Sequence, residues 1–141
     1  MSLVTIRQKI GEKLASLTGD GQPLQEWHAN HVAALGGYPA ATFEPSDVAN
    51  DFETNVENRR TYAFRITLHQ EMEKVGRDNA IGILCGAVDT LIDAFDEDSS
   101  LGGAVIECKA LPSVWGIYRE GTGLVLYAEL KLEAWTITNV T

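Results

Sequence analysis

The chain is poor in cationic side chains and has no long apolar run. Its 141 residues include 11 Lys and Arg against 20 Asp and Glu, which gives a net charge of −9. Proteins that bind nucleic acid through its phosphates need clustered cations, and so do proteins that dock on anionic membranes. No segment reaches the roughly eighteen apolar residues of a membrane span. We therefore expect no specific nucleic acid and no membrane among its partners.

Cysteine is also scarce, with Cys85 and Cys108 as the two examples. Two cysteines do not make a disulfide-rich secreted scaffold. Cys85 falls on the apolar side of an expected helix and Cys108 falls in an expected strand. We expect two buried free thiols, which behave as small hydrophobic side chains, although a disulfide between them stays open. The chain is expected to fold in a reducing cytosol.

Motifs of catalysis and ligand binding are missing as well. The serines and threonines of the turns lack the nucleophile-elbow pattern, and the glycine-rich turns lack the dinucleotide-binding fingerprint. His28 and His31 have the spacing of two metal ligands, but structural zinc takes four protein ligands and catalytic zinc three. His69 stands alone in a strand pattern, so we expect it at the surface. The sequence therefore predicts no enzyme, no cofactor and no metal.

Two segments have the apolar period of an amphipathic helix. The first runs from Leu3 to Leu17, and its stripe is Leu3, Ile6, Ile10, Leu14 and Leu17. The second runs from Asn79 to Phe95, with Asp78 as the expected N-cap. Its apolar face is predicted to contain Ile81, Leu84, Cys85, Val88, Leu91, Ile92 and Phe95.

Alternating apolar residues predict strands. The clearest pattern is Thr61–Gln70, in which Tyr62, Phe64, Ile66 and Leu68 share one face. Leu124–Ile137 alternates too and is long enough to require a bend or bulge. Shorter strands are expected at Pro23–His28, Pro39–Phe43, Ala104–Lys109 and Val114–Glu120. The last of these is predicted to pair with the final strand as a hairpin across Gly121-Thr122-Gly123.

Strands joined by tight turns indicate an α+β fold, a mostly antiparallel β-sheet with two amphipathic helices packed on one face. Residues 1–141 are expected to form a single domain. The segment Pro45–Arg60 is rich in Asp, Glu and Asn and has few apolar residues. We expect a polar loop or flap there, at about residues 45–60.

Six side chains are candidates for contacts between subunits or with a partner. They are Arg59, Arg60, Arg65, Trp115, Tyr118 and Arg119. The three arginines between 59 and 65 are either ordinary surface charge or meet the acidic face of a neighbouring copy. The other three lie on or beside an expected edge hairpin and belong to the residue types enriched at interface hot spots. For Trp115, the alternative is a role in capping the core.

The span from Thr61 to Val140 resembles the tail terminator, or tail completion, proteins of long-tailed bacteriophages. The resemblance lies in the order of the elements. They are the Tyr62–Leu68 strand, the Asn79–Phe95 helix, the Leu101–Gly103 turn, the Ala104–Cys108 strand, the loop with Trp115 and the Leu124–Ile137 strand. The N-terminal helix and the polar segment near residues 45–60 also fit the layout of this group.

The resemblance implies a structural virion protein without catalytic residues. Proteins of this group form a six-membered ring at the head-proximal end of the tail, which ends tail-tube polymerisation and offers a docking surface to the head connector. The implied partners are five further copies in a homo-hexamer, the tail-tube protein and the head–tail connector protein, with assembly in the host cytoplasm. Two alternatives stay open. One is another head–tail joining or minor tail protein, and the other is a small α+β enzyme or ligand-binding module using His28, His31, Asp89 and Asp93.

Overall fold

The structure, a computed structural model, describes the backbone of residues 3–30, 35–52, 57–121 and 123–139, and their side chains except those of 47–52, 57–59 and 138–139. Two helices and five strands follow one another along the chain. They are α1 (Leu3–Ser16), β1 (Glu26–His28), β2 (Ala40–Phe52), β3 (Glu57–Glu71), α2 (Arg77–Glu97), β4 (Glu107–Glu120) and β5 (Gly123–Asn139).

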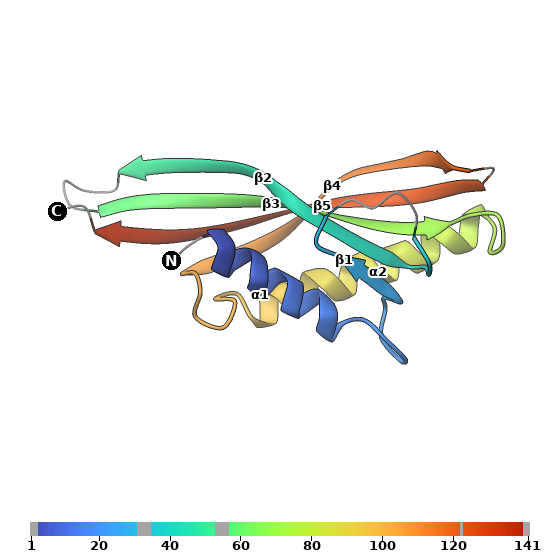
Figure 1. Cartoon of the computed structure of the whole chain (residues 1–141), viewed down its shortest axis with the longest axis horizontal. Coiled ribbons are helices and arrows are strands. Elements are labelled where there is room, and N and C mark those ends of the chain that lie inside the picture. The colour runs from blue at the N-terminus through green and yellow to red at the C-terminus, as the bar shows by residue number, and fades with distance from the viewer. Residues whose placement is uncertain (1–2, 31–34, 53–56, 122, 140–141) are drawn as a thin grey trace.

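The five strands form one sheet in the order β1-β2-β3-β5-β4. Only the short β1 runs parallel to its neighbour β2, and the other pairs are antiparallel. Both helices lie on the same side of this sheet (Figure 1). The expected α+β fold, with helices on one face of a mostly antiparallel sheet, is therefore confirmed.

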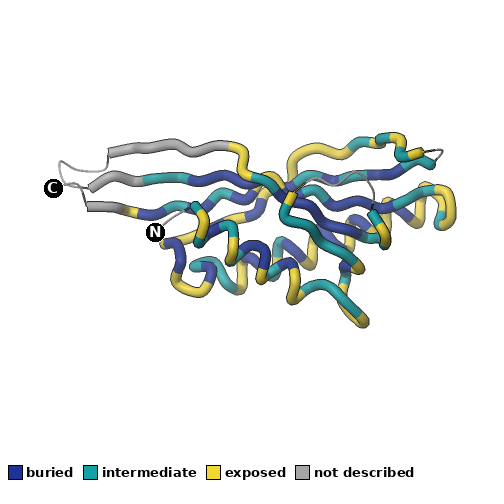
Figure 2. Tube along the Cα trace, viewed as in Figure 1, coloured by how far each residue is buried: buried dark blue, intermediate teal, exposed yellow. Residues whose placement is uncertain are grey.

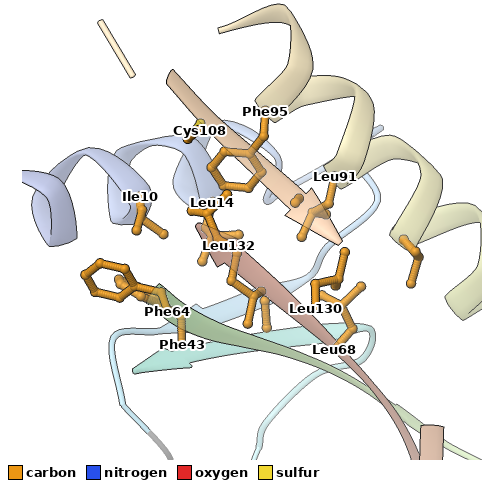
Figure 3. Close-up of a cluster of buried hydrophobic side chains, with 14 of the residues drawn as sticks. Ile10, Leu14, Phe43, Phe64, Leu68, Leu91, Phe95, Cys108, Leu130 and Leu132 are labelled. Carbon is orange, nitrogen blue, oxygen red and sulfur yellow. The ribbon is translucent and has the colours of Figure 1, made fainter. Parts of the chain in front are cut away.

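The core lies between the sheet and the two helices. The predicted alternation of β3 places Phe64 opposite Leu132 and Ile66 opposite Leu130 of β5, and all four side chains are buried. Ile10 and Leu14 of α1 and Leu91 and Phe95 of α2 point toward these strands (Figure 3). Burying one side chain of this size stabilises the folded state by roughly 1.5–3 kcal/mol. The apolar layer between the sheet and the helices therefore supplies most of the driving force for folding.

Helix α2 begins earlier than the sequence predicts. Its N-cap is Gly76 and not Asp78, and Gly76 has a φ of 83°. This left-handed conformation suits a residue without Cβ, and it lets the chain reverse direction after β3. The Asn79 side chain donates a hydrogen bond to the Val75 carbonyl oxygen at 2.7 Å. The local turn geometry therefore decides where the helix starts.

The expectation of a polar loop at Pro45–Arg60 is wrong for the described part of this segment, which forms strands. β2 continues to Phe52, and β3 starts at Glu57 and pairs with β2 from Asn58 onward. Residues 53–56 lie outside the described residues. Strand pairing uses backbone groups, so it tolerates polar side chains wherever no core has to be covered. The ends of β2, β3 and β5 extend beyond both helices (Figure 1).

The two strands expected at Ala104–Lys109 and Val114–Glu120 are one strand, β4, which starts at Glu107. The register shifts between Pro112 and Trp115. Such an irregularity accommodates a residue that cannot donate to the ladder. The predicted hairpin between β4 and β5 is confirmed, since Glu120 pairs with Gly123, and Thr122 lies outside the described residues. The sequence predicted a bend or bulge in the final strand, β5, but the extra residue of the bulge lies in β4, between Pro112 and Trp115.

The expectation of two buried thiols is wrong for Cys85. Both cysteines are free, Cys85 is exposed and Cys108 is buried. The sheet-facing stripe of α2 is Ala80, Leu84, Ala87, Val88, Leu91 and Phe95. Ile81 and Cys85 each directly follow a residue of this stripe, Ala80 and Leu84, and therefore lie beside it on the helix surface. Both are exposed. No helix among the described residues has the length and apolar content needed to cross a bilayer.

The two thiols should react with a thiol reagent at very different rates. Burial raises the pKa of Cys108 to about 11, and the thiolate is the reactive form. At pH 8, Cys85 should be labelled within minutes, and Cys108 only after unfolding. Mass spectrometry of the labelled protein measures this, and a Cys85→Ser variant serves as control because it should lose the fast phase. Rapid double labelling of the folded chain would contradict the burial of Cys108.

Candidate functional site

A polar cluster around His69 occupies the sheet face opposite the helices, here called the outer face. His69 is 3% exposed, so the expectation of a surface residue is wrong. Its Nε2 lies 3.0 Å from the Thr42 Oγ1 of β2, and its Nδ1 lies 2.9 Å from the Tyr118 hydroxyl of β4. Both ring nitrogens therefore have partners, and the imidazole connects three strands.

Aromatic rings complete this outer-face cluster. The rings of His69 and Tyr118 meet edge to face at 5.7 Å between centroids, and the rings of Tyr118 and Tyr127 lie 6.1 Å apart. Gly116 stands directly opposite Tyr127. A Cβ at position 116 would lie 2.6 Å from the Tyr127 Cζ, so only glycine leaves the ring its place across β4.

The segment before β2 is tied to the same end of the sheet. The Tyr38 hydroxyl donates to Glu120 Oε2, and the Leu35 N–H donates to Glu120 Oε1 at 3.3 Å. Burial, followed by the hydrogen bond to Glu120, raises the pKa of Tyr38 well above its usual range. Glu120 thus connects the tip of the β4–β5 hairpin to a segment more than eighty residues earlier.

A cleft of about 230 Å³ opens above the cluster. Its lining residues come from four strands and are Thr42, Glu44, Arg65, Thr67, His69, Tyr118, Tyr127 and Glu129. At its rim, Arg65 Nη1 lies 3.7 Å from Glu44 Oε1, and both side chains are about half exposed. An ion pair of this kind contributes at most about 1 kcal/mol.

The Thr42–His69–Tyr118 arrangement resembles a hydroxyl next to a base and a third polar group. Thr42 is only 5% exposed, and deprotonating it would use the imidazole nitrogen that holds it in place. The geometry therefore suits a cross-link between strands better than an activated nucleophile. Within the described residues, no three His, Cys, Asp or Glu side chains are placed to hold a metal.

The residues suspected in the enzyme alternative do not come together in this cleft. His28 Nε2 lies 3.2 Å from Glu26 Oε2 at the other edge of the sheet, and His31 lies outside the described residues. Asp89 and Asp93 are exposed on α2. His69 and Thr42 carry no sequence signal, since neither belongs to a motif. Only the strand pairing brings them together.

Four of the six candidate interface residues divide between the two faces of the sheet. Arg65 and Tyr118 line the outer-face cleft. Trp115 and Arg119 stand opposite Ala128 and Leu124 of β5, so by alternation they project to the helix side of β4. Arg60 is half-buried, with Nη1 3.4 Å from the Tyr62 hydroxyl. Arg59 lies in β3, and its side chain is outside the described residues.

Exposed apolar side chains gather along β4. Nine large hydrophobic side chains are exposed among the described residues, and five of them lie in or just before this strand. These five, here called the β4 edge, are Ile106, Leu111, Val114, Trp115 and Ile117. Much of β4 is exposed, whereas the middle of β3 is buried (Figure 2). Trp115 is 40% exposed and stands opposite the buried Ala128 of β5, so part of its ring is open to a partner and the capping role stays an alternative.

No protein-family model matches the chain, and a search of curated proteins found no match. The functional argument therefore starts from three structural features. They are the outer-face cluster, the β4 edge and the strand ends that extend beyond the helices.

Replacing Tyr118 by Phe should lower the free energy of unfolding by about 1 kcal/mol, because the His69 imidazole loses a hydrogen-bond partner while the ring is retained. Tyr127→Phe is the matched control. Within the described part of the chain, the Tyr127 hydroxyl has no hydrogen-bond partner, so this variant should lose under 0.5 kcal/mol. Urea unfolding monitored by circular dichroism measures both, and equal losses would contradict the cross-link.

Alkaline pH should lower the stability of the fold by ionising Tyr118. Burial and the charge of Glu120 raise the pKa of Tyr118 from 10.0 to about 12. Because the fold favours the neutral phenol, the stabilisation is complete below pH 10 and is lost as the pH rises toward 12. A tyrosinate absorbance titration should show a late component to which Tyr38 and Tyr118 both contribute, and Tyr118→Phe should reduce it by one tyrosine. An unchanged titration curve in this variant would rule out the late ionisation.

Proposed function

We propose that this chain is a structural, non-enzymatic virion protein of the tail terminator type. It forms a homo-hexameric ring at the head-proximal end of a phage tail. The ring ends tail-tube polymerisation and offers a docking surface to the head–tail connector. The resemblance of the element order and the α+β fold support this proposal.

The observation that carries the proposal is the β4 edge. Monomeric proteins seldom expose contiguous apolar patches, and larger patches mark interaction sites. Here Trp115 and Ile117 are exposed on the helix side of β4, at the border of the sheet, Val114 precedes them at the register shift, and Leu111 is exposed on the outer face of the same strand. Covering this apolar surface would stabilise the assembly by about 25 cal/mol for each Å² that is removed from water. A neighbouring subunit is therefore the natural cover for this edge.

Both edges of the sheet have features that hinder hydrogen-bonded pairing with strands of other molecules. β1 covers β2 only from Ala40 to Thr42, and the register of β2 then shifts between Pro45 and Asp47. β4 has the same combination of a proline and a register shift at Pro112. Prolines and bulges in edge strands prevent these strands from pairing with the edge strands of other molecules. Such protection fits a subunit that has to associate through one geometry and stop at a closed ring.

Charge sets a second condition on assembly. Each copy has a net charge of −9, so six copies repel one another at a distance. Ring closure then depends on apolar contacts and on local pairing of opposite charges. Moderate salt screens the repulsion over about 8–10 Å and should favour the ring, in contrast to an association held by ion pairs alone.

A position elsewhere in the neck or tail is the main alternative, because the same fold could serve a head–tail joining or minor tail protein. Antibody labelling of intact particles distinguishes the two. A label at the head-proximal end of the tail supports the terminator position, and a label at the tail tip supports a minor tail subunit.

The purified chain should form a six-copy ring, alone or after mixing with tail-tube subunits. Native mass spectrometry measures the copy number, and negative-stain microscopy shows whether the assembly is closed. Raising the salt from 20 to 200 mM should strengthen assembly. A chain that is monomeric alone, at both salt concentrations and in the presence of tail tubes would contradict the proposal.

A further inference from the structure

An apolar groove of about 390 Å³ runs between α1 and β1. It is lined by Val4, Arg7, Gln8, Gly11, Glu12, Ala15, Trp27, Ala29 and Phe43. The ring of Trp27 stacks on Phe43 at 6.4 Å between centroids. Val4, at one end, is 74% exposed. The groove therefore has an apolar floor that is open to solvent.

Gly11 lets helix α1 pack closely on the Trp27 ring at the floor of the groove. A Cβ on this residue would lie 3.3 Å from the Trp27 ring, which is tighter than ordinary van der Waals contact. Without a side chain at position 11, α1 and the indole approach closely, and both line the groove. Arg7 Nη2 donates to the Ala29 carbonyl oxygen at 3.4 Å, so one wall is held to the segment after β1.

The groove and the β4 edge belong to opposite borders of the sheet. β1 and β4 are the first and last strands in the sheet order. Helix α1 contacts β1, and helix α2 contacts β4. An apolar projection on one border and an apolar hollow on the other are the two halves of a head-to-tail contact, in which different patches of successive copies meet.

We propose that the β4 edge of one copy docks into the α1–β1 groove of the next. This inference rests on the proposed ring and names the surfaces that close it. Trp115 and Ile117 enter the groove. They share the helix side of β4 with Arg119, and the row from Trp115 to Arg119 is about 13 Å long at 3.3 Å per residue. The α1 wall from Val4 to Ala15 is about 16 Å long at 1.5 Å per residue, so the lengths match.

Charge favours a second copy as the occupant. Arg119 is exposed and, within the described part of the chain, has no ion-pair partner. Glu12 stands exposed on the α1 wall and lies 3.5 Å from Lys9 Nζ. The groove lining includes Arg7 as well as Glu12, and the Arg7 guanidinium donates to the Ala29 carbonyl oxygen, so docking places the Arg119 guanidinium where Glu12 is the carboxylate available to it. In a chain with a net charge of −9, a cation beside the apolar row and a carboxylate beside the hollow make the two borders complementary.

The contact predicts a specific behaviour of paired variants. Trp115→Glu damages the projection and keeps the groove, and Ala15→Glu damages the groove and keeps the projection. Each variant alone should be monomeric, with association at least ten-fold weaker than that of the wild type. Mixed together, they should form one-to-one pairs and nothing larger, because only one intact contact is left. Sedimentation velocity and native mass spectrometry count the copies.

Matched controls separate the contact from damage to the fold. Ser16→Glu adds the same charge on the next residue of α1, which does not line the groove, and should assemble like the wild type. Trp115→Phe keeps an apolar ring and should also assemble. Val4→Glu is a second groove variant, and circular dichroism confirms that each variant is folded.

The outcomes separate this inference from the proposed function. Rings that form normally with Trp115→Glu and Ala15→Glu would overturn the docking and leave the ring intact. Monomeric variants that do not pair on mixing would overturn the head-to-tail contact in the same way. A wild-type chain that is monomeric at all concentrations and with tail tubes would overturn both.

Discussion

The difference in rise per residue between strand and helix limits how much of this sheet can be covered. The 17 residues of β5 extend about 56 Å at 3.3 Å per residue, whereas the 21 residues of α2 extend about 31 Å at 1.5 Å per residue. Two helices therefore bury the middle of one face and leave the strand ends uncovered (Figure 1). The strand ends that extend beyond the helices follow from this mismatch, whereas the β4 edge is exposed because β4 is the last strand of the sheet.

The outer-face cluster and the β4 edge are connected through one strand. Tyr118 projects to the outer face and is held by His69, while its neighbours Ile117 and Arg119 project to the helix side. Fixing Tyr118 therefore fixes the direction of the row from Trp115 to Arg119, the surface proposed for docking. Gly116 contributes to the same end, because its missing Cβ leaves room for Tyr127. A polar cross-link on one face thus orients the apolar side chains of the proposed contact on the other.

The sequence predicted those parts of the fold in which burial and period coincide. The alternation around Phe64 and the three-to-four spacing of both helices identified the core because apolar residues face the helix–sheet interface. The polar strands between residues 45 and 60 were missed since they extend past the core and have no apolar face to detect. His69 was missed because its partners come from other strands. Of the candidate contact residues, Trp115 and Arg119 share one side of β4, as alternation within the predicted Val114–Glu120 strand implies, but only the register with β5 shows that this is the helix side.

The central claim is that a neighbouring copy covers the β4 edge. Cysteine cross-linking measures this contact directly, using Ala15→Cys and Ile117→Cys together in a Cys85→Ser background. Oxidation should link the α1 wall of one copy to β4 of the next and give a ladder of covalent species that ends at six. A ladder that continues past six would contradict a closed ring. Protein that assembles but yields no linked species would contradict the contact itself.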